Sequence, residues 1–552
     1  MKIIAAIEVD LDDTPLGTRS RLGEMLCGQV VLARTVERVL RAGELAGVWV
    51  ACPAQQLDRC RELLGGRQVN YWPHAPAAPP HRALVRAARK WSLDGWRGGL
   101  GGACSMDEYT DCRVLAESAK AESADGVLAV PGASAVVDPV ILDGLVHQFR
   151  EVSEEVRMTF CQAPPGLAGV VYATNILEEM ASKRIPPGWI LTYKPDAPAA
   201  DLIFKPCCFN TPQAVRHAVG RLLADTDSAV ERLTNLLTAH ADPDANTIGR
   251  FLIERERSYV PALPREVELE LTTADPYPDT PHRPRGSRVG QRGPIDLAMI
   301  RKVADDWAGG RLGRRVSRDD TLIVLGGFGD PILHPGFAEA LAILRAAGVY
   351  GLAVRTAAVD LTEPIRAALI EHRVDVLEVL LDAWTQETYA HVTASPAASL
   401  ADVVANLEAL GRERDARGWP CPIILPVMTK CRANVSELDD FYDGWIRKLG
   451  CANVVGFNAY SSRLEDLSVI NMSPPTRTPC RRIMSRCTIL ADGRMTICDQ
   501  DHAGEHTIGS IADQSLHDLW NAPAMQGIRQ RHLAGDSAAM PLCANCSEWH
   551  RP

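Results

Sequence analysis

The chain has 552 residues, of which 46% are hydrophobic and 23% are charged. This composition is typical of a globular protein with an ample core, and it excludes a fibre, a wholly disordered chain and a multispan membrane protein. The formal net charge of −10 argues against a nucleic-acid partner, because phosphate backbones demand a net basic surface. The apolar stretches are strand-length, and the first residues predict a β-strand rather than a secretory signal, so we expect a cytoplasmic protein without a membrane partner.

The first 225 residues alternate short apolar runs with helical patterns. Strands are expected at 3–9, 47–52, 126–130, 169–173 and 202–206, and helices at Val30–Arg41, Val140–Val152 and Pro212–Ala224. This alternation predicts an α/β domain with a largely parallel sheet at 1–225. A helical connector is predicted at 226–264, where Pro261 and Pro264 interrupt the pattern.

A second alternating block is predicted at 265–470. Its expected strands are Val267–Thr272, Thr321–Leu325, Gly351–Val354, Val376–Leu381, Ile423–Val427 and Val454–Phe457. The expected helices are Ile295–Trp307, Phe337–Ala347, Glu363–His372, Leu400–Arg414 and Val435–Leu449. Six βα units are too few for a closed eight-unit barrel, so the block predicts a partial parallel (β/α)6 barrel and an α/β fold class for the whole chain.

The tail at 471–552 contains the most specific chemical pattern, a set of cysteines. Cys543 and Cys546 lie on one tight turn, so both can reach one metal centre. Cys480 and Cys498 flank a predicted hairpin that turns at Asp492-Gly493 and would return Cys498 towards Cys480. Four soft ligands suit an iron–sulfur cluster, and spacing alone leaves structural zinc as the alternative.

The tail resembles a SPASM domain, the iron–sulfur extension C-terminal to many radical S-adenosylmethionine (SAM) enzymes. In the family pattern, the first cysteine is followed by nine to fifteen residues, a Gly, four residues and a second cysteine. Cys480 fits with twelve residues before Gly493, whereas Cys487 leaves only five and is assigned as a non-ligand. Because no further cysteines follow the CxxC pair up to Pro552, the resemblance implies one [4Fe-4S] cluster on Cys480, Cys498, Cys543 and Cys546.

Residues 267–461 resemble the radical SAM core. The segment Leu325-Gly326-Gly327-Phe328-Gly329-Asp330-Pro331 is similar to the family's loop after the second strand, which holds the amino group of SAM. The segment 379–389 is similar to the family's fourth-strand region. The resemblance therefore implies a vestigial SAM site at Gly326, Gly327 and Asp330.

The family's three cluster cysteines are replaced in this chain. They are spaced CxxxCxxC after the first strand, and these positions are Asp275, Asp279 and His282 here. Two carboxylates and an imidazole do not normally assemble an iron–sulfide cube. The spacing could hold a single divalent ion, but we favour a degenerate loop whose polar residues face water. We therefore expect that reductive SAM cleavage is lost.

The N-terminal domain resembles the sugar nucleotidyltransferases, above all the cytidylyltransferases that activate acidic sugars. The segment 15–22 with Gly17-Thr18-Arg19, followed by 26–36, is similar to their opening loop, where backbone amides approach nucleotide phosphates. Gln29 stands where the family often has Lys, and the segment at Ala133-Ser134 lacks the family's metal-binding Asp. The resemblance therefore implies a degenerate domain.

The three units in this order resemble the spiro-SPASM group. We expect an iron–sulfur protein of the radical SAM/SPASM superfamily that binds one cluster, lacks conventional SAM cleavage and engages a peptide or protein partner. The alternative is an enzyme, either a cytidylyltransferase-like nucleotidyltransferase or an unorthodox SAM-dependent catalyst that modifies peptides or proteins.

Overall fold

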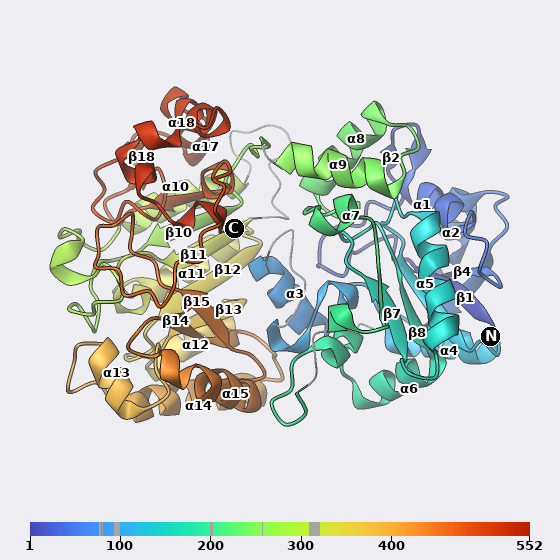
Figure 1. Ribbon diagram of the computed structural model, residues 1–552, viewed down its shortest axis with the longest axis horizontal. Coiled ribbons are helices and arrows are strands. Elements are labelled where there is room, and N and C mark those ends of the chain that lie inside the picture. The colour runs from blue at the N-terminus through green and yellow to red at the C-terminus, as the bar shows by residue number, and fades with distance from the viewer. Residues whose placement is uncertain are drawn as a thin grey trace. The chain divides into compact units, whose positions relative to one another are not determined.

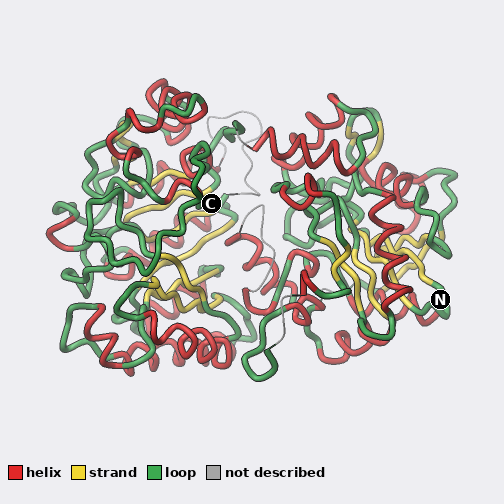
Figure 2. The backbone as a smooth tube through the Cα atoms, in the orientation of Figure 1, coloured by secondary structure: helices red, strands yellow, loops and turns green. Residues whose placement is uncertain are grey.

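The computed structural model describes residues 1–552 except 77, 78, 80, 93–99, 199–201, 257, 309–320 and 552. The chain divides into two compact units, Met1–Glu256 and Arg257–Pro552, which we call the N-terminal and C-terminal units. In each unit, strands lie at the centre and helices surround them (Figures 1 and 2). Within the described ranges, no helix combines the length and the apolar character that a membrane crossing demands.

The N-terminal unit is built on a seven-stranded sheet in the order β5-β4-β1-β6-β8-β7-β9. Four neighbouring strands are parallel: β5 (Asn70–His74), β4 (Val48–Pro53), β1 (Ile3–Glu8) and β6 (Gly126–Pro131). Strand β8 (Val170–Ala173) is antiparallel to both β6 and β7 (Met158–Cys161), and β9 (Cys208–Phe209) is parallel to β7. The predicted α/β domain with a largely parallel sheet is therefore confirmed.

Two predicted elements of this unit are wrong. The expected strand at 202–206 is a single 3-10 turn at Leu202–Phe204, where Phe204 is 81% exposed and has no buried face to pair. The expected helix at 212–224 is only the short α7 (Gln213–His217), because the chain turns away before Gly220, whose φ of +142° is foreign to a helix.

Helices cover both faces of this sheet. Alternate residues of β1 enter opposite cores, as the period of two in a strand requires: Ile3 and Ile7 enter one, Ile4 and Ala6 the other. The first core contains residues of α1 (Val31–Val39), α2 (Leu57–Leu64), α5 (Pro139–Val152), α8 (Asp227–Ala239) and α9 (Ala245–Glu256). The second contains residues of α4 (Cys112–Ala121) and α6 (Thr174–Lys183). The N-terminal unit also contains the amphipathic helix α3 (Arg82–Ser92).

The C-terminal unit is built on a nine-stranded sheet in the order β15-β14-β13-β12-β11-β10-β16-β17-β18. Six strands are parallel and follow the chain: β10 (Glu266–Glu270), β11 (Leu322–Gly326), β12 (Gly351–Thr356), β13 (Val376–Leu380), β14 (Ile423–Lys430) and β15 (Asn453–Gly456). The helices between them are α10 (Leu297–Ala308), α11 (Phe337–Ala346), α12 (Glu363–Glu371), α13 (Gln386–Val392), α14 (Leu400–Ala416) and α15 (Leu438–Leu449). The predicted succession of six βα units is confirmed.

Strand β10, the first strand of this unit along the chain, separates an apolar core from a face of ion pairs. Val267 and Leu269 of β10 lie in the core, while the alternating glutamates point to the opposite side of the sheet. There Glu268 pairs with Arg355 of β12 (2.6 Å), and Glu270 pairs with Arg292 (2.7 Å). Buried carboxylates require such partners, so this face is held by ion pairs rather than by apolar packing.

The tail extends the sheet at the free side of β10. Strand β16 (Arg486–Ile489) is parallel to β10, with Val267 opposite Cys487. It forms a hairpin with β17 (Arg494–Thr496) that turns at Asp492-Gly493, where Gly493 has φ +83°, so the predicted hairpin is confirmed. Strand β18 (Thr507–Ser510) and the helices α16 (Arg482–Ser485), α17 (Leu516–Trp520), α18 (Pro523–Leu533) and α19 (Pro541–Ala544) complete the tail.

Candidate metal centre

The four cysteines singled out in the tail come from three separate segments. Cys480 lies just before α16, Cys498 follows β17, and Cys543 and Cys546 belong to α19 and the turn after it. Burial raises the pKa of all four thiols, that of Cys543 to about 12, and the Cys480 thiol is a further cause for each of the other three. Electrostatic interaction between the thiols therefore links Cys480 to the whole set.

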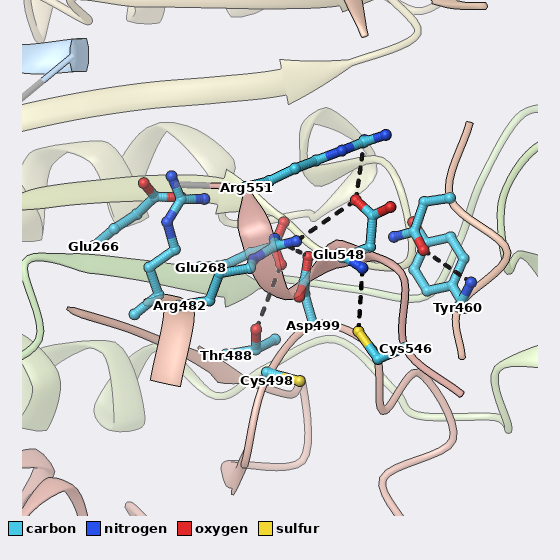
Figure 3. Close-up of polar contacts among 12 residues, drawn as sticks. Glu266, Glu268, Tyr460, Arg482, Thr488, Cys498, Asp499, Cys546, Glu548 and Arg551 are labelled. Atoms are coloured by element: carbon cyan, nitrogen blue, oxygen red, sulfur yellow. Dashed lines mark hydrogen bonds and ion pairs between the residues drawn. The ribbon is translucent and has the colours of Figure 1, made fainter. Parts of the chain in front are cut away.

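Hydrogen-bond donors and acceptors surround these cysteines. The backbone N–H of Glu548 donates to the Cys546 Sγ at 3.3 Å, as drawn in Figure 3. The Cys480 N–H donates to His532 Nδ1 at 3.4 Å, and Arg477 Nη2 donates to the Cys543 carbonyl at 2.9 Å. The cysteine segments are thus held in place by bonds that leave the sulfur atoms available as ligands.

Cys487, the fifth cysteine of the tail, lies in different surroundings. It is on β16, 2% exposed, and packs in the apolar core of the C-terminal unit. Burial raises its pKa, and the charged groups that influence it are Arg529, Glu266 and Glu268 rather than another thiol. These surroundings agree with its assignment as a core residue.

The loop after β10 contains Asp275, Asp279 and His282, which the structure does not bring together. Asp275 accepts from Arg285 Nε at 2.7 Å and from the Tyr277 N–H at 2.8 Å, whereas Asp279 is exposed. In the described part of the chain, no three His, Cys, Asp or Glu side chains gather as they would around a single metal ion. The expectation that this loop's polar residues face water is met by Asp279 and is wrong for Asp275, whose side chain is 9% exposed, and for His282, which is 2% exposed.

His282 is buried because it has found partners far away in the sequence. Its Nδ1 lies 3.1 Å from the Val392 carbonyl, and its Nε2 lies 2.9 Å from the Sγ of Cys431, just after β14. A carbonyl oxygen can only accept a hydrogen bond, so Nδ1 carries the proton and Nε2 accepts from the thiol. Burial lowers the pKa of His282 and raises that of Cys431, which favours this neutral pair. No pattern in the sequence indicated this contact, which spans 149 positions.

The loop after β11 places Gly326, Gly327 and Asp330 at the carboxyl ends of the parallel strands. The Gly327 N–H donates to Glu268 Oε1 at 3.3 Å, and Gly327 has φ +84°, which favours glycine. Gly329 lies so close to the neighbouring loop that a Cβ there would fall 2.2 Å from the Thr272 carbonyl oxygen. The glycines therefore allow tight packing of this loop against β10 and the residues after it.

The Asp330 carboxyl is engaged inside the protein. Its Oδ2 accepts from Thr356 Oγ1 (2.8 Å) and the Ala357 N–H (2.9 Å), and its Oδ1 accepts from the Ile332 N–H (3.3 Å). The cavity beside it holds about 20 Å³, which is room for a water-sized group. Ion pairs fill its walls, among them Arg283 with Asp382 (2.5 Å).

Burial raises the pKa of Asp330 from 3.8 to about 7, and this has a measurable consequence. Between these pH values the folded protein keeps a proton that the unfolded chain has released, so the free energy of unfolding should fall as pH rises. We expect a loss of roughly 2–4 kcal/mol over this range. Urea denaturation of the wild type and Asp330→Asn at several pH values measures it. The variant should show a flatter pH profile, and parallel profiles would contradict the assignment.

The N-terminal unit contains a cavity of about 400 Å³ at the carboxyl ends of its parallel strands. Ala133 lines it, as the resemblance to nucleotidyltransferases implied, but Arg19 is directed to Glu24 and Gln29 to Glu37 instead. Arg21 of the segment 15–22 also lines it, but the polar lining comes mainly from residues that the sequence did not single out: Glu8, Asp10, Asp13, Arg82, Arg86, Asp111 and Asp225. The sequence could have indicated these lining residues only by their position, because several of them follow predicted strands.

The chain resembles several known proteins at low identity. An uncharacterized protein of Treponema pallidum (strain Nichols) is 25% identical over 351 residues, which cover 61% of this chain and 92% of that protein. Native anSMEcpe with bound AdoMet aligns at 10% identity with a TM-score of 0.38, covering 50% of this chain and 88% of that one. Streptococcus suis SuiB bound to the precursor peptide SuiA aligns at 11% identity with a TM-score of 0.37, covering 54% and 80%.

One further solved structure aligns at a similar level of identity. A cytidylyltransferase from Leptospira borgpetersenii aligns at 15% identity with a TM-score of 0.32, covering 46% of this chain and 93% of that one. A match to a protein-family model is more specific than these alignments and covers the cysteines of the tail. Residues 480–547, which contain all four of them, match the SPASM family, an iron–sulfur cluster-binding domain.

Proposed function

We propose that this protein binds one [4Fe-4S] cluster through Cys480, Cys498, Cys543 and Cys546, and that its central domain at 265–470 does not cleave SAM reductively. The observation that supports the first part is the coincidence of the family match with three thiols that each interact electrostatically with the Cys480 thiol. Soft anionic sulfur is the donor that such a cluster requires, so the residues present fit the group.

The chain's own residues would do three things for this group. The four thiols, once deprotonated, would cap its irons, and a bound cluster would supply one-electron redox chemistry. The Glu548 N–H would stabilise the Cys546 sulfur through its hydrogen bond. The partial burial of all four cysteines would restrict access of water to the site.

The loss of SAM cleavage is proposed from the surroundings of three positions. Asp275 is bonded to Arg285 and His282 to Cys431, so neither side chain is free to serve as a ligand in this arrangement. Asp279 points to solvent from the same loop. The cavity beside Asp330 would have to widen before a molecule of the size of SAM could enter it. These contacts support a core that keeps its fold without its redox centre.

A peptide or protein partner is part of the proposal. The segment 469–472, where the tail begins, exposes three large apolar side chains, Val469 (45%), Ile470 (63%) and Met472 (63%). They line a cavity together with Asn545 and Ser547, which neighbour the Cys546 ligand. Exposed apolar groups in a cluster are typical of surfaces that bind other chains.

The first part is tested by the composition of protein purified without oxygen. We expect about four irons and about four sulfides per chain, with no stoichiometric zinc. Iron and sulfide assays and metal analysis measure this directly. Stoichiometric zinc without sulfide would replace the cluster by the structural zinc site that the same spacing allows.

A second candidate function is nucleotide binding or transfer by the N-terminal unit. Its cavity favours this candidate, because ligands of open parallel sheets bind at the carboxyl ends of the strands. The missing carboxylate at Ala133-Ser134 opposes it, because Mg²⁺ has lost its expected anchor. We expect no release of pyrophosphate from CTP with Mg²⁺ and acidic sugars, measured by a coupled phosphate assay. Robust release that Arg82→Ala abolishes would make the protein a nucleotidyltransferase.

A further inference from the structure

Arg482 is a buried cation that the cysteine pattern did not single out. It begins α16, two residues after Cys480, and its side chain is 14% exposed. The guanidinium forms an ion pair with the Asp499 carboxylate and lies 3.9 Å from a Glu548 carboxylate oxygen. Figure 3 shows the Arg482 guanidinium directed towards both acids.

Each partner of Arg482 is attached to a different cysteine segment. Asp499 directly follows Cys498, and Glu548 follows Cys546 by two residues while its N–H donates to the Cys546 Sγ. Arg482 itself comes from the Cys480 segment. One guanidinium therefore connects the three chain segments that supply the four thiols.

The charge of Arg482 is maintained despite its burial. An arginine side chain is not deprotonated in proteins, and the Asp499 carboxylate supplies its counter-charge. Another charged group at this site is Arg551, which pairs with Glu548 at 2.9 Å. A fixed positive charge therefore lies where the three cysteine segments meet.

We infer that Arg482 is a positioning residue that aligns the cysteine segments and raises the reduction potential of the cluster they bind. The inference rests on the proposed function, because it requires a cluster. On reduction a cluster gains one negative charge, which a nearby buried cation stabilises more strongly than the same cation would in water. Substituting Arg482 by a neutral residue removes this charge and the ion pair of Asp499, while Glu548 keeps its pair with Arg551, and the lost positive charge disfavours the reduced state.

The test is a potentiometric titration of anaerobically prepared, cluster-containing full-length protein, followed by electron paramagnetic resonance. We expect Arg482→Gln to lower the midpoint potential and Arg482→Lys, which keeps the charge, to restore most of it. Asp499→Asn removes a negative charge at the same place and should raise the potential. These opposite shifts distinguish a charge effect from loosening of the site, which would move both neutral variants in the same direction.

Arg494→Gln is the matched control, since Arg494 belongs to the same tail but pairs with Asp492 at the hairpin turn. It should leave the potential unchanged. Unchanged potentials in both Arg482→Gln and Asp499→Asn, or equal shifts in one direction, would overturn the inference. If Arg482→Gln cannot hold iron, Asp499→Asn and Arg482→Lys decide by the same criteria. A wild-type protein without iron and sulfide would instead refute the proposed function.

Discussion

Replacement of Cys543 or Cys546 by alanine is expected to reduce the iron content of anaerobically purified protein from about four atoms per chain to nearly none. Each thiol would cap one iron of the proposed cluster, and the two lie on one turn with the Cys480 thiol beside them. A cube that loses one of its anionic ligands opens an iron to water and oxygen. Iron and sulfide assays, with the visible absorption of the cluster, measure the loss.

Cys487→Ala is the control for this experiment. Its side chain packs in the apolar core of the C-terminal unit, so its removal should cost stability but leave the iron content largely intact. Thermal unfolding of the cluster-containing protein reports the first effect, and the iron assay the second. Loss of iron in Cys487→Ala with retention in Cys480→Ala would overturn the choice of ligands.

Dithionite-reduced protein incubated with SAM is expected to yield no 5′-deoxyadenosine above a control without protein. Reductive cleavage needs SAM bound to an open iron, and Asp275, Asp279 and His282 offer no thiolate to hold such an iron. The tail cluster cannot take this role if four cysteines cap its four irons. Liquid chromatography with mass detection measures the nucleoside directly.

The contrary result has a recognisable form. Multiple-turnover production of 5′-deoxyadenosine that disappears in Asp275→Ala or His282→Ala would restore the enzyme interpretation. Binding of SAM alone would not, since Gly326, Gly327 and Asp330 could still contact it without any electron transfer. Production that persists in both variants but requires Cys546 would instead assign the chemistry to the tail.

The order of the elements could be predicted from the sequence because each βα unit carries its own local pattern. The six parallel strands of the C-terminal unit and the turn at Asp492-Gly493 are local features of this kind. The strand expected at 202–206 was wrong, because an apolar run forms a strand only where a partner strand can pair with it and bury it. The periodicity of a sequence contains no information about that partner.

The candidate site could be predicted only where residues share a spacing. Cys480, Cys498 and the CxxC pair were singled out because a hairpin, which is present, and a tight turn would bring them together. Arg482 and the His282–Cys431 pair were missed, because their roles depend on tertiary contacts that no spacing encodes. The assumption that polar loop residues face water failed at His282 for the same reason.

The pairing of β16 with β10 affects the order in which this chain can fold. The two strands are joined across 220 residues, as the contact between Glu268 and Thr488 illustrates. During synthesis β10 therefore emerges with one edge unpaired, and that edge waits for the last part of the chain. Such long-range pairing is slow, and an open strand edge invites association with other chains. The cysteine-rich tail thus closes this edge of β10, and the edge stays unpaired until the tail has been synthesised.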